Sequence, residues 1–182
     1  VVRRKVFEEA GMYDEWHFAR PQIEDIELGA RVRGLERKIL LCPDIQVTHL
    51  KRWTLANVVR TDLRDRGIPW ARLLAHRNAV LSTATLNLRW SEKLNTVLVW
   101  VSLLLLFTAA WYRSWTLLLV AVLCPVVVLL FNLPMLRFFL RIRGPLFALR
   151  VIPVHLMYYF LNGISFSVGL LLQQMIGAPL PN

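Results

Sequence analysis

The second half of the chain lacks acidic residues. All twelve Asp and Glu residues of the 182-residue sequence lie at or before Glu92. After Lys93 the only charged residues are five arginines, Arg113, Arg137, Arg141, Arg143 and Arg150. A stretch with so few charges excludes an ordinary soluble domain and predicts helices that enter a membrane. The composition therefore changes class near residue 94.

Cysteine is scarce as well. Cys42 lies in the polar first half, and Cys124 lies inside an apolar run of the second half. Two cysteines placed in this way do not predict a disulfide or a metal site, and they are typical of a protein from a reducing compartment.

Basic residues outnumber acidic ones, and the net charge is +10. Clustered basic residues can bind the phosphates of nucleic acids, but the first 93 residues intersperse 17 basic with 12 acidic side chains. The other basic residues flank apolar runs, which is the usual signal for the cytoplasmic side of membrane helices. We therefore expect membrane lipids as partners, and no nucleic acid.

The chain divides into a polar part at 1–77, a connector or interface segment at 78–93, and a transmembrane region at 94–182. It begins with Val and carries no short apolar leader. We therefore expect it to be the C-terminal portion of a longer protein.

Within the polar part, hydrophobic periodicity predicts both helices and strands. Short apolar runs at 38–41 and 45–49 flank a Cys-Pro-Asp turn and predict two strands. Helices are expected over 2–10, from Glu24, over 54–66 and, after a break at Gly67 to Trp70, up to about His76.

Three carboxylates, those of Glu24, Asp25 and Glu27, open the second of these helices. The helix dipole favours each of them by ~0.3–1 kcal/mol, so a purely structural explanation is open. Successive helix residues point ~100° apart, so Glu24 and Asp25 cannot face the same way. One of the two can face a cleft while its neighbour caps the helix or pairs with a cation.

The order of motifs resembles the C-terminal half of a processive-type family 2 glycosyltransferase. The resemblance rests on Glu24-Asp25 followed by Glu27-Leu28-Gly29, on His49-x-x-Arg52-Trp53, and on the membrane spans that follow. It covers residues 1–77 by motif and the rest by hydropathy. It implies an α/β fold, the C-terminal half of an A-type nucleotide-sugar transferase domain at 1–77, followed by an α-helical transmembrane region.

The resemblance gives Asp25 the role of general base in an inverting sugar transfer, with Glu24 as the alternative. The acceptor hydroxyl must lose its proton as it attacks the anomeric carbon, and a carboxylate at ~2.6–3.2 Å can take that proton. Arg52 would contact the donor diphosphate, because its planar charged fork suits phosphate. Trp53 would stack on the acceptor.

His49 stands where the family usually has Gln, so its substrate-binding role is open. Ordinary explanations exist for all three residues of this motif: a membrane-facing cation, an interfacial tryptophan and a hydrogen-bonded histidine at a strand end. A second departure is Glu36, where the family often has Gly, and Gly34 is an alternative end for the helix.

The family also uses a divalent metal, Mg or Mn, held by an aspartate pair in its nucleotide-binding half. No Asp-x-Asp occurs in this sequence. The resemblance therefore places the metal ligands outside this chain, before Val1, and the chain alone is expected to bind donor poorly.

Apolar runs in the transmembrane region predict three spans, at about 94–111, 115–131 and 151–175. The first two are each ~26 Å long, marginal for a ~30 Å hydrocarbon core, so they form either a spanning hairpin or a re-entrant pair. An interfacial helix is expected at about 134–143, where Arg137 and Arg141 lie one turn apart.

Polar and small residues mark the third span. His155 and Asn162 are candidates for a functional role or for a helix-helix hydrogen bond. Gly163, Ser167 and Gly169 are small enough to allow close packing on the first two helices.

These features predict a glycosyltransferase fragment in the cell membrane, with its polar part in the cytoplasm and its C-terminus outside. Its partners would be a nucleotide-diphosphate sugar and a lipid-linked or saccharide acceptor. The alternative is a non-catalytic membrane protein whose basic cytoplasmic segment binds a partner or anionic lipid.

Overall fold

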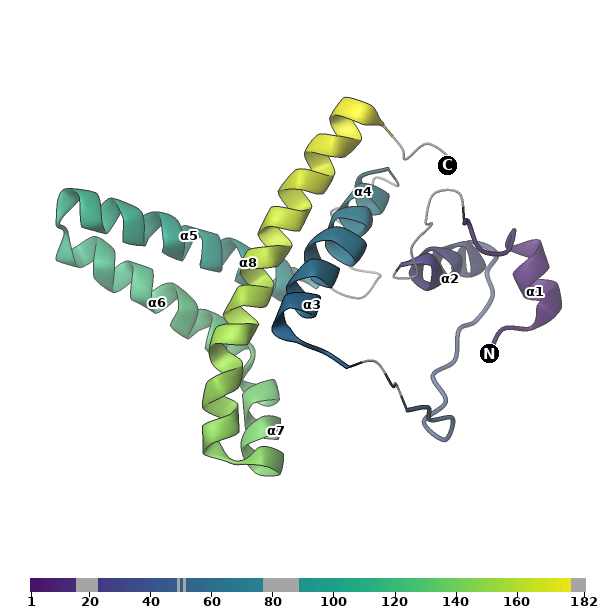
Figure 1. The fold of residues 1–182 in the computed structure, drawn as a ribbon, viewed down its shortest axis with the longest axis horizontal. Helices are drawn as coiled ribbons and strands as arrows, with labels where there is room; N and C mark the ends of the chain where they lie inside the picture. The colour runs from purple at the N-terminus through teal and green to yellow at the C-terminus, as the bar shows by residue number, and fades with distance from the viewer. Residues whose placement is uncertain (16–22, 49, 51, 77–88, 178–182) are drawn as a thin grey trace. The chain divides into compact units, whose positions relative to one another are not determined.

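A computed structural model describes residues 1–15, 23–48, 50, 52–76 and 89–177 (Figure 1). Helices make up 78% of these described residues, and none of them forms a β-strand. In chain order the elements are α1 (Arg4–Glu9), α2 (Glu24–Gly34), α3 (Leu55–Arg60), the π-helix η1 (Thr61–Gly67), α4 (Ile68–His76), α5 (Trp90–Tyr112), α6 (Trp115–Phe131), α7 (Leu133–Arg143) and α8 (Pro145–Ile176).

The predicted α/β fold is therefore wrong, and the part of the chain that the structure describes is all-α. The two expected strands run as irregular chain, with Leu41 94% and Val47 91% exposed. Only the turn between them forms, where Ile45 N donates to Cys42 O at 3.1 Å. A two-stranded hairpin is marginal by itself and needs a further strand or a covering helix, and neither is supplied within the described residues.

The chain forms two compact units, one of Val1–Arg77 with Val168–Asn182 and one of Asn78–Ser167. In the first unit, α1 and α2 share a small core of Ala10, Leu28 and Val32. Arg31 joins the two helices: its guanidinium donates to Ala10 O and, at 2.6 Å, to Met12 O. The turn after α1 uses Gly11 at φ +81°, a conformation that suits glycine.

Helix α2 ends at Gly34 in a Schellman motif. Glu36 N donates to Arg33 O at 2.9 Å, and Arg37 N donates to Val32 O at 3.2 Å. This motif places Glu36 in the left-handed region, at φ +58°, where glycine is the usual residue. The position at which the resemblance expects Gly therefore has the backbone conformation that favours Gly.

From Leu55 to His76 the backbone is helical without a gap, so the predicted break at Gly67 to Trp70 is wrong. Thr54 caps the segment, its hydroxyl accepting from Asn57 N at 3.2 Å. The wider π-helical turns of η1 directly precede Pro69. Such turns relieve the clash between a proline ring and the carbonyl four residues earlier, and they allow the helix to continue.

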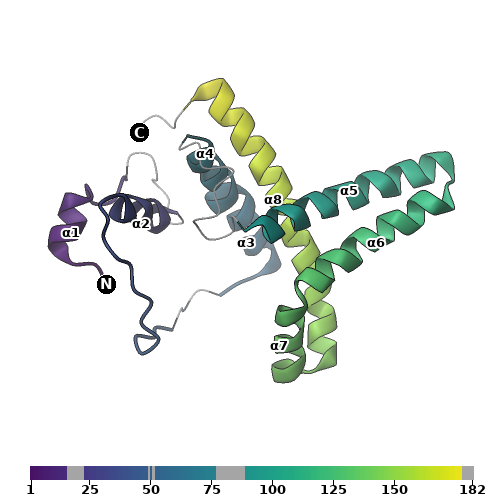
Figure 2. The ribbon, with the colours of Figure 1, turned by 180° about the vertical axis from the view of Figure 1, so that it is seen from behind.

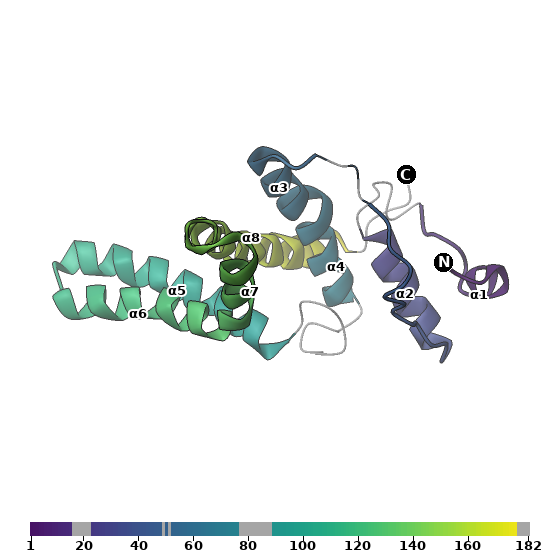
Figure 3. The same ribbon diagram turned by 90° about the horizontal axis from the view of Figure 1, so that it is seen from below.

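The second unit contains a helical hairpin. Helices α5 and α6 lie side by side in all three views (Figures 1, 2 and 3). Arg113, in the left-handed region at φ 49°, and Ser114, which caps α6, make the turn. Exposed aromatic side chains surround this tip, namely Trp111, Tyr112 and Trp115. Because α5 begins at Trp90, the last residues of the predicted connector belong to this helix.

Helices α5 and α8 are each long and apolar enough to cross a membrane. Helices α6 and α7 meet this condition only together, and they are bent by 69° at their junction. The described residues therefore hold two or three candidate spans, and the bend fits a broken span or a re-entrant loop. Helix α7 covers the residues at which an interfacial helix was predicted, and α8 begins six residues before the expected third span.

Close packing in the second unit depends on Gly163. A Cβ at this position would lie 1.9 Å from Trp100 Nε1 of α5, so a larger residue would displace the indole. The Trp100 ring stacks on Phe160 at 5.0 Å. Gly169 was predicted to face the first two spans but packs against α4 in the first unit, where its Cβ would lie 2.5 Å from Ala71 Cβ.

Candidate functional site

The start of α2 separates its three carboxylates into different environments. Glu27 is buried, at 5% exposure, and both of its oxygens accept from Arg31 Nε, at 3.1 and 2.8 Å. Since Arg31 in turn holds the end of α1, Glu27 contributes to the packing of the two helices. Its carboxylate is occupied and is not placed to take a proton from a substrate.

Asp25 is exposed on the first turn of α2. Its Oδ1 accepts from the backbone N of Ile26 at 2.8 Å, and it forms no ion pair with a described residue. Glu24 is half-buried, and its Oε2 is buried without a hydrogen-bond partner among the described residues. Of the two candidates for the base, Asp25 is the more exposed.

Arg52 and Trp53 lie in the irregular segment just before α3, and both are exposed. Among the described residues, no hydrogen bond or ion pair joins Arg52 to Asp25. His49, the third residue predicted for this motif, lies outside the described residues. The structure therefore leaves Asp25 and Arg52 accessible without placing them in direct contact.

A metal centre has no support from the described residues. No three His, Cys, Asp or Glu side chains among them lie close enough together to hold a metal ion. The divalent metal that the resemblance implies therefore has no ligand set in this part of the chain.

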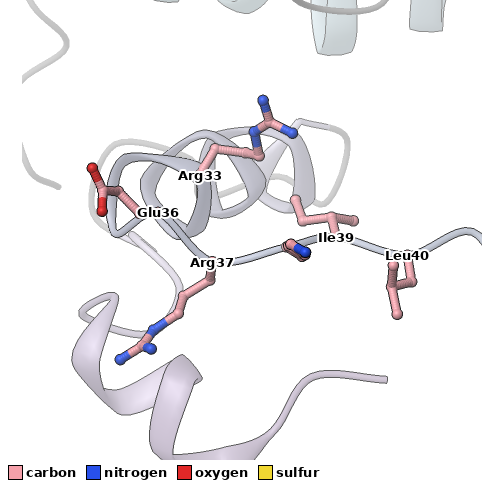
Figure 4. A pocket seen from close by; sticks show the side chains of 6 residues that line it. Arg33, Glu36, Arg37, Ile39 and Leu40 are labelled. Carbon is pink, nitrogen blue, oxygen red and sulfur yellow. The ribbon is translucent and has the colours of Figure 1, made fainter.

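A shallow hollow of about 360 Å³ lies at the C-terminal end of α2. Figure 4 shows the labelled Arg33 and Glu36 around it and Arg37 pointing toward α1, where Arg37 pairs with Glu9 at 3.1 Å. Its lining residues are Arg33, Glu36, Arg37, Lys38, Ile39 and Leu40. None of the predicted site residues lines this hollow.

Sequence reasoning missed a polar cluster inside the second unit. Tyr159 of α8 is fully buried, and its hydroxyl accepts from Asn95 Nδ2 at 3.0 Å. The same hydroxyl lies 3.2 Å from Glu92 Oε2 and 3.2 Å from Asn132 Oδ1. We call these four residues the Tyr159 cluster. They come from α5, from the junction of α6 with α7, and from α8.

Hydrogen bonding in the Tyr159 cluster is incomplete. Asn95 Oδ1 is buried without a partner among the described residues, and so is His155 Nε2. The His155 ring meets the Tyr159 ring edge-on at 4.9 Å. Of the two polar residues predicted in the third span, His155 therefore borders the cluster. Asn95 and Asn132 stand at the ends of apolar runs, and this placement was the sequence feature that could have indicated the other members of the cluster.

Comparison with models of protein families, with curated proteins and with solved structures gives no match. No family is therefore assigned, and the candidate site rests on its own residues.

Proposed function

We propose that this chain is the membrane-anchored part of an inverting family 2 glycosyltransferase. It would transfer a sugar from a nucleotide-diphosphate donor to a lipid-linked or saccharide acceptor at the cytoplasmic face. The observation that carries the proposal is the environment of Asp25. It is exposed at the start of α2, while Glu27, two residues later, is buried against Arg31.

Asp25 acts as the general base. Its carboxylate accepts the proton of the acceptor hydroxyl while that oxygen attacks the anomeric carbon, and the bond to the nucleoside diphosphate breaks on the opposite face. The product has inverted configuration. The positive end of the helix dipole favours a negatively charged side chain at this position.

Arg52 and Trp53 bind the substrates. The leaving diphosphate gains negative charge as the bond breaks, and the permanently charged guanidinium of Arg52 can pair with two of its oxygens. Trp53 is 52% exposed, which leaves ring surface for stacking on a sugar. Their exposed position before α3 supports these roles.

The candidate membrane helices support a location at the membrane surface, where a lipid-linked acceptor is available. Arg89, Lys93 and the arginines of α7 would mark the cytoplasmic side, and Arg113 the opposite side. We propose on this basis that the polar part lies in the cytoplasm and the C-terminus outside.

The test is sugar transfer by the full-length protein in membranes, supplied with radiolabelled nucleotide-diphosphate sugars. Asp25→Asn keeps the size of the side chain and removes the base. We expect kcat to fall ~10²–10⁴-fold, the usual contribution of a general base. Donor binding should stay close to wild type, because Asp25 does not contact the diphosphate in this mechanism.

Glu24→Gln is the matched control, a neighbouring carboxylate changed in the same way. It should retain transfer within a few-fold of wild type. Near wild-type turnover by the Asp25→Asn variant would overturn the role of Asp25, and loss of turnover only in Glu24→Gln would assign the base to Glu24.

A second candidate function is that of a non-catalytic membrane protein whose basic segment binds anionic lipid or a partner. The exposed arginines of α7 favour it. An Asp-x-Asp motif at the end of a strand, roughly a hundred residues upstream as the family resemblance implies, would support the enzyme. No transfer from any labelled donor, with every site residue intact, would support the second function.

A further inference from the structure

Four arginines in the second unit carry no countercharge. Arg137, Arg141 and Arg143 of α7 and Arg150 of α8 are all exposed, and none forms an ion pair or hydrogen bond with a described residue. No acidic residue follows Glu92 anywhere in the sequence. Among the described residues, no carboxylate therefore pairs with these guanidinium groups.

Apolar side chains accompany these arginines. Arg137 and Arg141 lie one turn apart on the same side of α7, whereas Phe138 and Ile142 are turned by ~100° from them. Phe138 is 56% and Ile142 60% exposed. One side of α7 is thus cationic and an adjacent side is apolar, the pattern of a helix that lies in a membrane interface.

Aromatic contacts and a sharp turn join α7 to the start of α8. Phe139 packs on Phe147 of α8 with ring centroids 5.5 Å apart, and Phe138 contacts Phe139 at the same separation. Gly144 makes the turn at φ +81°. The turn therefore keeps the end of α7 close to the start of α8. We give the name α7–α8 basic surface to the exposed residues Arg137, Phe138, Arg141, Ile142, Arg143 and Arg150 of these two helices.

The bend at the start of α7 matters for its position. The helix turns by 69° from the direction of α6. If α6 enters the bilayer along its normal, α7 then runs closer to the plane of the bilayer than to that normal. This orientation brings the arginines to the level of the lipid phosphates and leaves Phe138 and Ile142 to enter the acyl boundary.

We propose that the α7–α8 basic surface binds the phosphate head groups of anionic membrane lipids. Guanidinium groups pair with phosphate oxygens in a two-point geometry, and the surface of the cytoplasmic leaflet carries negative potential. A zwitterionic lipid offers a phosphate already neutralised by its own ammonium group, so the surface prefers lipids with net negative charge. The proposal does not depend on sugar transfer. It rests on the same arginines of α7 that favour the second candidate function, and it names anionic lipid as their ligand.

The experiment uses the full chain in detergent micelles mixed with phosphatidylglycerol or phosphatidylcholine. Lipid that stays bound is counted by native mass spectrometry. We expect phosphatidylglycerol to be retained in preference to phosphatidylcholine. Raising NaCl from about 0.1 M to about 1 M shortens the screening length from ~10 Å to ~3 Å and should abolish the preference.

Arg141→Gln should weaken phosphatidylglycerol retention roughly fivefold, the factor expected for one arginine at an anionic surface. Combined with Arg137→Gln and Arg143→Gln, the loss should reach the order of a hundredfold. Arg113→Gln, at the tip of the α5–α6 hairpin, removes the same charge elsewhere and should leave retention unchanged.

Three results would overturn the proposal. Equal retention of the two lipids would remove the charge preference. An equal loss in Arg113→Gln and Arg141→Gln would show that net charge alone matters. Retention of soluble pyrophosphate as strong as that of phosphatidylglycerol would show that the surface is a site for free phosphate anions.

Discussion

The left-handed backbone conformation of Glu36 is less favourable for a residue with a Cβ than it would be for glycine. A side chain with a Cβ is disfavoured there by roughly 1–2 kcal/mol, although glycine loses more backbone entropy on folding. The Schellman bonds of Glu36 N and Arg37 N fix this conformation. The end of α2 is therefore less stable than its hydrogen bonds alone would make it.

We predict that Glu36→Gly stabilises the end of α2 by about 0.5–1 kcal/mol. Hydrogen exchange of the amides of Glu36 and Arg37 should slow accordingly, because both amides are hydrogen-bonded in the motif. Glu36→Ala removes the carboxylate but keeps the Cβ, so it should bring no such slowing. Equal protection in the two variants would mean that charge, and not backbone conformation, limits stability here.

At the scale of the elements, the Tyr159 cluster connects helices of the second unit through polar contacts. It connects residues that are far apart in sequence: Asn95 and Tyr159 are separated by 64 positions. The hydroxyl has one proton and two acceptors at 3.2 Å, on Glu92 and Asn132. Polar contacts of this kind fix how helices pack in an apolar environment, where packing otherwise depends on shape.

We predict that Tyr159→Phe destabilises the second unit by about 1–2 kcal/mol, because it removes the hydroxyl and leaves buried polar atoms unpaired. The measurement is thermal unfolding in detergent, followed by tryptophan fluorescence. Tyr112→Phe makes the same change at an exposed position of the hairpin tip and should have little effect. Equal midpoints for the two variants would contradict a structural role for the hydroxyl.

The sequence was sufficient to predict the helices of the second unit. Each apolar run carries its own signal, and Arg113, Pro134 and Gly144 mark breaks that are local in sequence, so the predicted bounds lie within six residues of the observed ones. It was insufficient for the segments at 38–41 and 45–49. A strand depends on partners elsewhere in the fold, so alternating apolar residues alone could not establish that a sheet forms.

In the candidate site too, the features that are local in sequence could be predicted, and those that depend on distant contacts could not. That Glu24 and Asp25 would point in different directions followed from the helical period. The pairing of Glu27 with Arg31 is local, at i,i+4 spacing, but that Arg31 would hold the end of α1 depended on contacts with residues about twenty positions earlier. The Tyr159 cluster needs three helices to be assembled, and no local pattern reports that assembly.

On the scale of the whole molecule, the two cysteines differ in accessibility. Cys42 is exposed in the turn after the segment at 38–41, whereas Cys124 of α6 is buried and its thiol lies 3.4 Å from Val120 O. A membrane-impermeant maleimide should therefore label the native protein once, at Cys42. The label also reports which side of the membrane the polar part occupies.

We predict labelling of Cys42 in inside-out vesicles and none in sealed right-side-out cells, as a cytoplasmic polar part requires. Mass spectrometry of the labelled peptide is the measurement, and Cys42→Ser should abolish the signal. Labelling of intact cells at Cys42 would reverse the proposed orientation.

The burial of Cys124 has a further consequence. The thiol becomes reactive only when α6 separates from its neighbours. In the Cys42→Ser variant Cys124 is the only cysteine left, so the rate of its modification by a small permeant maleimide measures how often the hairpin opens. Under conditions where reclosing is faster than modification, that rate is proportional to the population of the open form. Cys124, a residue of the natural sequence, can therefore be used to measure local unfolding in the membrane region.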